Sequence, residues 1–197
     1  MERSSPHSHG YKLESQIREA FGRVVYTFTC HNKIVDRLQL MNNVIKISQI
    51  VLSAMTTGSF LVTIFSDGKI SGIIGAILAL ILLMLNMYMK NTDLAEEAQK
   101  HQQAANLLWK IREEYVSLLT DFDVMDVTSI VQKRNDLQNR TAEVYTGSPR
   151  TDPRSYKKAQ KALRYQEEQT FSEDEIDLML ANSIRRSNRQ TRTKKDI

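Results

Sequence analysis

Two runs of twenty residues without a charged side chain most constrain how this chain of 197 residues folds. They occupy residues 47–66 and 70–89, and neither contains Asp, Glu, Lys, Arg or His. A helix rises about 1.5 Å per residue, so each run reaches roughly 30 Å, the thickness of a bilayer's hydrocarbon core. Only Asp67, Gly68 and Lys69 separate the two runs, and so short a connection predicts a tight hairpin turn. The sequence therefore predicts a transmembrane hairpin with spans at 47–66 and 70–89.

Basic residues near the spans predict how the hairpin is oriented. Three precede the first span and two follow the second, whereas the turn offers only Lys69 beside Asp67. The positive-inside rule then places both termini in the cytoplasm and the turn outside. Two of the lysines border the membrane, where their long stems can reach the interface. The flanking basic residues are Lys33, Arg37, Lys46, Lys90 and Lys100, and the two border lysines are Lys46 and Lys90.

The rest of the chain is highly charged, which is why its mean hydropathy of −0.39 is typical of a soluble protein despite the two runs. Residues 1–10 contain no apolar core, so we expect a disordered N-terminus and no secretory signal. The single cysteine, Cys30, excludes an intrachain disulfide and suits a reducing compartment. The net charge of +4 is compatible with an anionic lipid surface or with nucleic acid.

Both segments that flank the hairpin have helical periodicity. Residues 11–46 carry apolar side chains at steps of three and four, which predicts an amphipathic N-terminal helix, and no proline separates it from the first span. Residues 90–125 follow a heptad spacing, in which Arg112 is the odd member and Ile111 is the alternative. The hairpin sets the two segments side by side, and we call this pair of segments the stalk. The heptad positions are Leu94, Ala98, His101, Ala105, Leu108, Arg112, Tyr115, Leu119 and Phe122.

Shorter helices are predicted after the stalk. Residues 127–170 contain one helix that ends at the sequence YTGSPRTDP and a second that starts near Pro153 and ends near Gln169. In residues 171–197, Ser172 and Glu175 have the spacing of a capping box, which opens a last helix toward Arg186 before a disordered basic tail. The predicted fold class is thus an all-α membrane protein, a two-span transmembrane helical hairpin with long amphipathic cytoplasmic helices and short C-terminal helices.

Polar and small residues inside the spans are the first candidate functional residues. On each span they share one face, at 100° of rotation per residue. In an oligomer, the hydroxyl stripe of the first span can line an aqueous pore that passes ions unselectively. The alternative is packing within the hairpin, since hydroxyls, amides and small residues commonly hold membrane helices together. Asn86 stands out because an amide deep in lipid needs a partner, and the hairpin register places it near Gln49. The first-span set is Gln49, Ser53, Thr56, Thr57 and Thr63, and the second-span set is Gly72, Gly75, Ala76, Ala79 and Asn86.

Outside the spans, few residues indicate chemistry. His31 and His101 lie at the same height of the stalk, where they can form a pH-sensitive or metal-binding pair. Two histidines alone make a poor metal site, so an interior hydrogen-bonded pair is the simpler interpretation, and we predict no metal. The run Asp121, Asp123 and Asp126 lacks the glycine turn of a calcium loop. No glycine-rich phosphate loop, Ser-His-Asp elbow or Cys-His arrangement occurs, so neither an enzyme nor a cofactor is expected.

Four segments around the hairpin carry a family resemblance. They are REAFGRVVYTF, HNKIVDRL, HQQAANLLWKIREEYVSLLTDF and KRNDLQNRTAEVYTGSPRTDP, and their order is more telling than any one of them. Over roughly residues 11–170 the chain resembles the SLATT family, small two-span membrane proteins of prokaryotic conflict systems. The matching positions are Phe21, Gly22, Arg23, Tyr26, His31, Asp36, Leu38, His101, Ala104, Trp109, Arg112, Tyr115, Leu119, Asp121, Arg134, Leu137, Tyr145, Pro149 and Thr151.

The resemblance implies a function. Members of the family are thought to be pore-forming or membrane-disrupting effectors, often encoded beside nucleotide-second-messenger synthases or reverse transcriptases in antiviral operons. The resemblance therefore implies an inner-membrane effector that forms a homo-oligomer and breaches the bilayer when such a partner signals. A membrane-anchored scaffold that recruits a soluble partner through its cytoplasmic helices is the alternative. Nucleic-acid binding by the basic tail is a weaker hypothesis, because no aromatic residue is interleaved there for stacking on bases.

Overall fold

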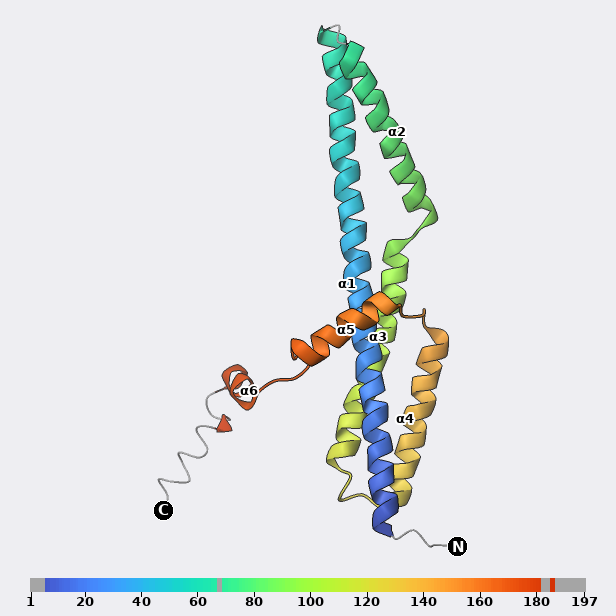
Figure 1. The fold of residues 1–197 in the computed structure, drawn as a ribbon, viewed down its shortest axis with the longest axis vertical. Coiled ribbons are helices and arrows are strands. Elements are labelled where there is room, and N and C mark those ends of the chain that lie inside the picture. Colours follow the sequence, from blue (N-terminus) through green and yellow to red (C-terminus); the bar gives the residue numbers. More distant parts are fainter. Residues whose placement is uncertain (1–5, 67–68, 182–184, 187–197) are drawn as a thin grey trace.

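The computed structural model describes residues 6–66, 69–181 and 185–186, and these residues form helices and connecting loops without any strand. The predicted all-α class is confirmed. The described residues form six helices in succession (Figure 1). Their bounds are α1 Pro6–Ser66, α2 Lys69–Asn91, α3 Leu94–Thr120, α4 Val127–Gly147, α5 Pro153–Tyr165 and α6 Glu173–Met179.

A single helix of 61 residues, α1, contains both the N-terminal amphipathic segment and the first span. It begins at Pro6, so the prediction of disorder is wrong for residues 6–10, and residues 1–5 lie outside the description. Proline suits a helix start because the first-turn N–H groups have no intrahelical acceptor. At the hairpin turn, Asp67 and Gly68 lie outside the described residues, and Lys69 is the first residue of α2.

The return segment is broken where the sequence predicts a continuous helix. The second span continues through Lys90 to Asn91, and α3 starts only at Leu94 because the Asp93 carboxylate caps it, accepting from the Glu96 N–H at 2.8 Å. At its other end α3 stops at Thr120, five residues before the predicted boundary at 125. The stalk therefore has its own helix, α3, separate from the second span.

The C-terminal helices begin where the sequence predicts; α4 also ends at Gly147 as predicted, whereas α5 and α6 end earlier. Asp126 and Asp152 cap α4 and α5, and the capping box predicted for Ser172 and Glu175 is present at the start of α6. The α5 helix stops at Tyr165 instead of near Gln169, since the residues at 167 and 169 have positive φ values of 51° and 85°. The α6 helix stops at Met179 instead of near Arg186. Most of the basic tail, residues 187–197, lies outside the description.

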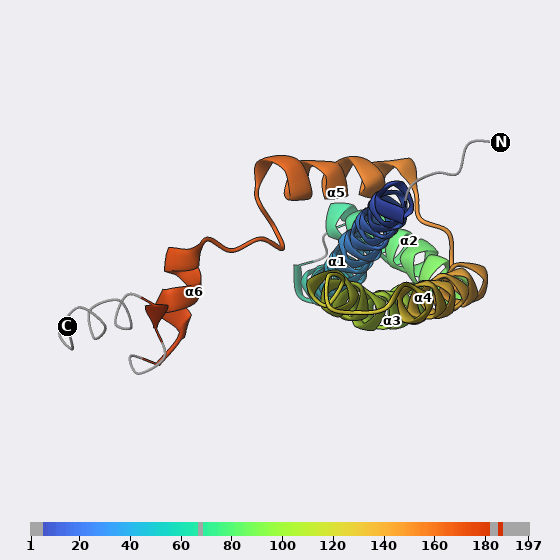
Figure 2. The ribbon, with the colours of Figure 1, turned by 90° about the horizontal axis from the view of Figure 1, so that it is seen from below.

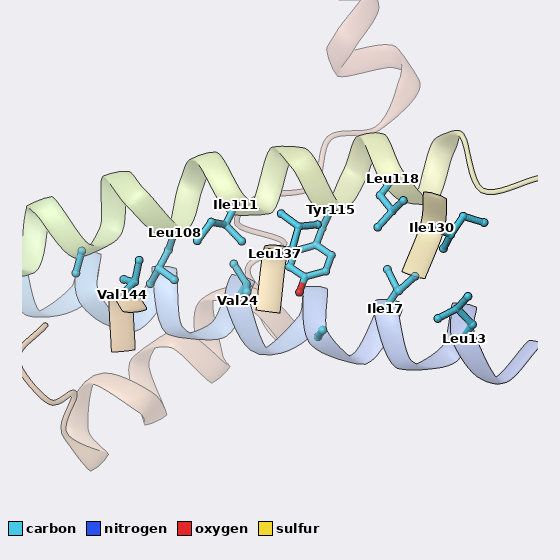
Figure 3. Close-up of a cluster of buried hydrophobic side chains, with 12 residues drawn as sticks. Leu13, Ile17, Val24, Leu108, Ile111, Tyr115, Leu118, Ile130, Leu137 and Val144 are labelled. Carbon is cyan, nitrogen blue, oxygen red and sulfur yellow. The ribbon is translucent and has the colours of Figure 1, made fainter. Parts of the chain in front are cut away.

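The stalk packs with α4 into a three-helix unit, whose core lies between α1, α3 and α4 (Figure 3). Ile111 and Leu118 are buried in this core, so Ile111, the alternative to Arg112, takes that heptad position, and Leu118 takes the place of the predicted Leu119, which packs at the edge of the core. An uncharged side chain fits the interface better than a guanidinium, whose desolvation costs free energy. The view along the stalk shows α5 on the side of α1 opposite α3 and α4 (Figure 2). The core comprises Leu13, Ile17, Ala20, Val24, Ala104, Leu108, Ile111, Tyr115, Leu118, Ile130, Leu137 and Val144.

Candidate functional site

The two span helices leave their apolar side chains uncovered. Both are long and apolar enough to cross a membrane, and almost none of their most apolar stretch is buried within the structure. Ile64, Ile77 and Met84 are 74%, 53% and 67% exposed. In water, so large an apolar surface is rare on a monomer, whereas a bilayer covers it. The helices thus have the surface of membrane spans.

Near the turn, the two span helices approach each other through small residues. A Cβ added at Gly75 would lie 3.1 Å from the Ser59 Cβ, and Gly72 lies against the Thr63 side chain. The Thr63 hydroxyl donates to the Ser59 carbonyl at 2.9 Å, so it accepts from the Ser71 hydroxyl, also at 2.9 Å. Close backbones and hydroxyl bonds of this kind hold membrane helices together.

At the other end of the hairpin, two amides pair. The Gln49 Nε2 donates to the Asn86 Oδ1 at 2.9 Å. The two side chains thus lie where the folded-back register predicts, and each gives the other a partner that lipid cannot provide. This contact joins α1 to α2 through two residues that are 37 positions apart in the sequence.

The hydroxyl stripe of the first span is divided between two surfaces. Thr56 and Thr63 are half-buried on the side of α1 that faces α2. Ser53 and Thr57 are exposed, and the Thr57 hydroxyl donates only to the Ser53 carbonyl of its own helix, at 3.0 Å. On α2, Ala79 is half-buried whereas Ala76 is exposed. Packing within the hairpin therefore accounts for part of the stripe, whereas Ser53 and Thr57 remain exposed.

An open groove of about 680 Å³ runs between α1 and α2 beside the paired amides. Its polar lining consists of Lys46, Gln49, Ser53 and Asn86, and its apolar lining of Ile50, Ala54 and Leu82. The border lysine of the first span thus shares a surface with the polar stripe. Lys90, the other border lysine, is exposed at the end of α2 and does not line this groove.

In the stalk, His31 and His101 form a buried contact between α1 and α3. Their Nδ1 atoms are 2.8 Å apart, and both residues are 3% exposed. The His101 Nε2 lies 3.5 Å from a Glu97 carboxylate oxygen, which favours a proton there and leaves the His101 Nδ1 to accept from His31. Burial, with the His101 charge as a second cause, lowers the pKa of His31 to about 4. Burial also lowers the pKa of His101, so the pair is neutral at pH 7.

No metal site surrounds this pair. Within residues 6–66, 69–181 and 185–186, no group of three or more His, Cys, Asp or Glu side chains is placed to hold an ion. Cys30 is buried beside the pair, and burial followed by the Asp152 charge raises its pKa to about 11, so the thiol is protonated. Asp126 uses its carboxylate to accept from the Ser129 N–H at 3.0 Å. It serves as a helix cap.

Two ion pairs join α1 to the residues that flank α5, with Asp152 before the helix and Glu168 after it, and the sequence pattern predicts neither. The Arg37 Nη2 lies 2.6 Å from the Asp152 Oδ2, and the Lys33 Nζ lies 2.7 Å from the Glu168 Oε2. The Arg37 guanidinium is the main cause that lowers the pKa of Asp152 to about 2. The partners are more than a hundred residues apart, so no local pattern joins them, and the sequence indicates Lys33 and Arg37 only as signals of membrane orientation.

Aromatic residues make further contacts across the stalk. The Tyr26 and Tyr156 rings stack with centroids 5.8 Å apart, and the Arg164 Nε donates to the Tyr26 hydroxyl at 3.0 Å. The Tyr145 hydroxyl lies 3.1 Å from the Thr27 Oγ1. These contacts bring α4 and α5 to the same part of α1.

The other family-like positions have varied surroundings. Tyr115 is 1% exposed in the core, and Phe21 packs against its edge. Trp109 is 49% exposed. Gly22 has open space around it and Arg23 pairs with Glu19 on the helix surface. Arg112 pairs with Glu113 at 2.7 Å, and its Nε is buried without a hydrogen-bond partner among the described residues. Pro149 lines a shallow polar pocket with His31, Tyr145 and Arg150.

Comparison with known families identifies the chain. Residues 13–175 match SLATT family 4, described as the SMODS and SLOG-associating 2TM effector domain family 4. The match covers most of the 197 residues, so the chain belongs to the SLATT family of two-span membrane effectors, and the family prediction is confirmed. This is not a known enzyme family. No curated protein and no solved structure matches the chain.

Proposed function

We propose that this effector oligomerises in the inner membrane and opens a path for ions when a partner protein signals. The observation that carries the proposal is the exposure of Ser53 and Thr57 inside a span, where the packing of α2 leaves both side chains uncovered. A single hairpin encloses no lumen. In an oligomer, these hydroxyls and the adjoining groove can face one another and hold water.

The family name supplies the context for this proposal. The family is described by its association with SMODS and SLOG systems, which supports a signalling partner for this chain. We therefore place the trigger in a nucleotide-second-messenger synthase or a reverse-transcriptase system, and the role in antiviral defence. The basic flanks favour the stalk and both termini on the cytoplasmic side, where such a partner acts.

The test compares membrane potential, measured with a dye, in bacteria that express the wild type or Ser53→Leu/Thr57→Leu. A matched control, Val51→Leu/Met55→Leu, changes two apolar and exposed positions of the same span. We expect depolarisation by the wild type and the control and loss of depolarisation in the Ser53/Thr57 variant, with equal insertion of all three. Equal depolarisation by all three would refute a pore lined by this surface. A strictly monomeric protein in bilayers would refute the proposal as a whole.

A membrane-anchored scaffold is the second candidate, and the surface of α3 favours it. Trp109 and Val116 are 49% and 40% exposed and lie seven residues apart, which places them on one helix face. Half-exposed aromatic residues are common anchors for partner proteins. Under this hypothesis Trp109→Ala abolishes recruitment of the partner, whereas Ser53→Leu/Thr57→Leu has no effect on signalling.

A further inference from the structure

The polar surface of α1 extends beyond the predicted membrane border. Nearly all its members are spaced by three or four residues, so they share one helix face. Two open grooves follow this face in succession. One, of about 390 Å³, lies between α1 and α3, and the other is the groove between α1 and α2 described above. The α1 residues of the face are Gln39, Asn42, Asn43, Lys46, Gln49, Ser53 and Thr57.

The surface carries one charged side chain, Lys46. The first groove is lined by amides and alanines, among them Gln99 and Gln102 of α3, and Lys46 is the charged residue that lines the second. Between Gln39 and Thr57 the sequence has no acidic residue, and α2 has none either. Among the residues that the structure describes, Lys46 makes no ion pair. An ion in the groove therefore meets an uncompensated positive charge.

From this juxtaposition we infer that the conducting path selects anions, with Lys46 as the residue that sets selectivity. The inference rests on the pore proposed above and refines it, because the stripe within the span predicts an unselective path. In a symmetric oligomer each subunit contributes one Lys46 at the same height, and rings of basic side chains characterise anion pores. Chloride and other small anions are the expected permeating species.

The position of Lys46 on its helix distinguishes this role from simple anchoring at the interface. An anchoring lysine would lie on the apolar face of α1, with Ile47 and Val51, which are 62% and 50% exposed. Lys46 instead shares the groove with Gln49 and Ser53. Lys90 provides the comparison, since it ends the second span without lining the groove.

The experiment measures reversal potentials across planar bilayers that contain the full chain, in a tenfold gradient of potassium chloride. We expect the wild type to prefer chloride over potassium roughly fivefold or more, the factor that one basic residue near a surface contributes. The preference should vanish in Lys46→Gln and reverse in Lys46→Glu. Lys90→Glu makes the same charge change at the other span and should shift the permeability ratio less than about twofold. If Lys46→Glu fails to insert, Lys46→Gln carries the test.

The outcomes separate the inference from the proposed function. Current without anion preference in the wild type, or an equal shift in Lys90→Glu, would overturn the role of Lys46 while leaving the pore intact. No current from any variant, with the protein inserted and oligomeric, would overturn the pore and the selectivity with it. Loss of chloride preference confined to the Lys46 variants would support both.

Discussion

The buried histidine pair makes the packing of the stalk sensitive to acid. The pKa of His31 falls from its ordinary value of 6.5 to about 4 in the folded chain, because burial and the His101 charge disfavour the protonated form. The unfolded chain then binds more protons than the folded chain, so stability is complete above pH 6.5 and is lost as the pH falls toward 4. Between pH 7 and pH 5 this linkage removes about 2 kcal/mol from the free energy of unfolding.

The charged groups near the histidine pair do not account for the loss of stability between pH 7 and pH 5. His101 titrates in the same direction as His31, with Glu97, Arg37 and Asp152 around it. Asp152 remains ionised at pH 5, because its pKa is about 2. The loss of stability above pH 5 should therefore come from the histidine pair.

The buried thiol next to His31 offers an assay. Cys30, the only cysteine, is 2% exposed, so a disulfide reagent reaches it when α1 separates from its neighbours. The labelling rate, divided by the rate in denaturant at the same pH, should rise about twentyfold between pH 7 and pH 5. The double variant His31→Gln/His101→Gln should lose this dependence. An equal rise in the double variant, or no rise in the wild type, would refute the linkage.

Three further predictions concern packing. Leu108→Ala removes a side chain with no exposure from the stalk core and should cost about 3 kcal/mol in the free energy of unfolding, measured by denaturant titration in detergent. Gly75→Val should weaken the hairpin by about 1–3 kcal/mol and lower its melting temperature, whereas Gly58→Val, with open space around its Cβ, should not; equal effects would contradict the close approach. Arg37→Asp should detach α5 and increase its proteolysis, whereas Arg37→Lys, which keeps a cation beside Asp152, should raise proteolysis less; unchanged proteolysis in Arg37→Asp would show that the ion pair is dispensable.

Much of this architecture is predictable from local patterns. Two uncharged runs that match the bilayer thickness imply a hairpin, because lipid cannot satisfy backbone groups outside regular helices. The hairpin in turn sets the register, and this brings Gln49 to Asn86 and His31 to His101. The capping box at Ser172 is likewise local. Each of these predictions depends on residues that are close in sequence or related by one fold-back.

The tertiary structure decided which residues distant in sequence come into contact and which polar side chains stay exposed. The pairing of Arg37 with Asp152, 115 residues away, depends on how α5 crosses α1, and no periodicity encodes that crossing. The same holds for the division of the hydroxyl stripe, since the approach of α2 buries Thr63 and leaves Ser53 exposed. It also holds for Lys46, which is a border lysine in the sequence and a groove residue in the fold. The sequence by itself determined which segments are helical and which can cross a bilayer, because hydropathy and spacing act locally; only the packing of helices against one another decided which polar side chains remain exposed.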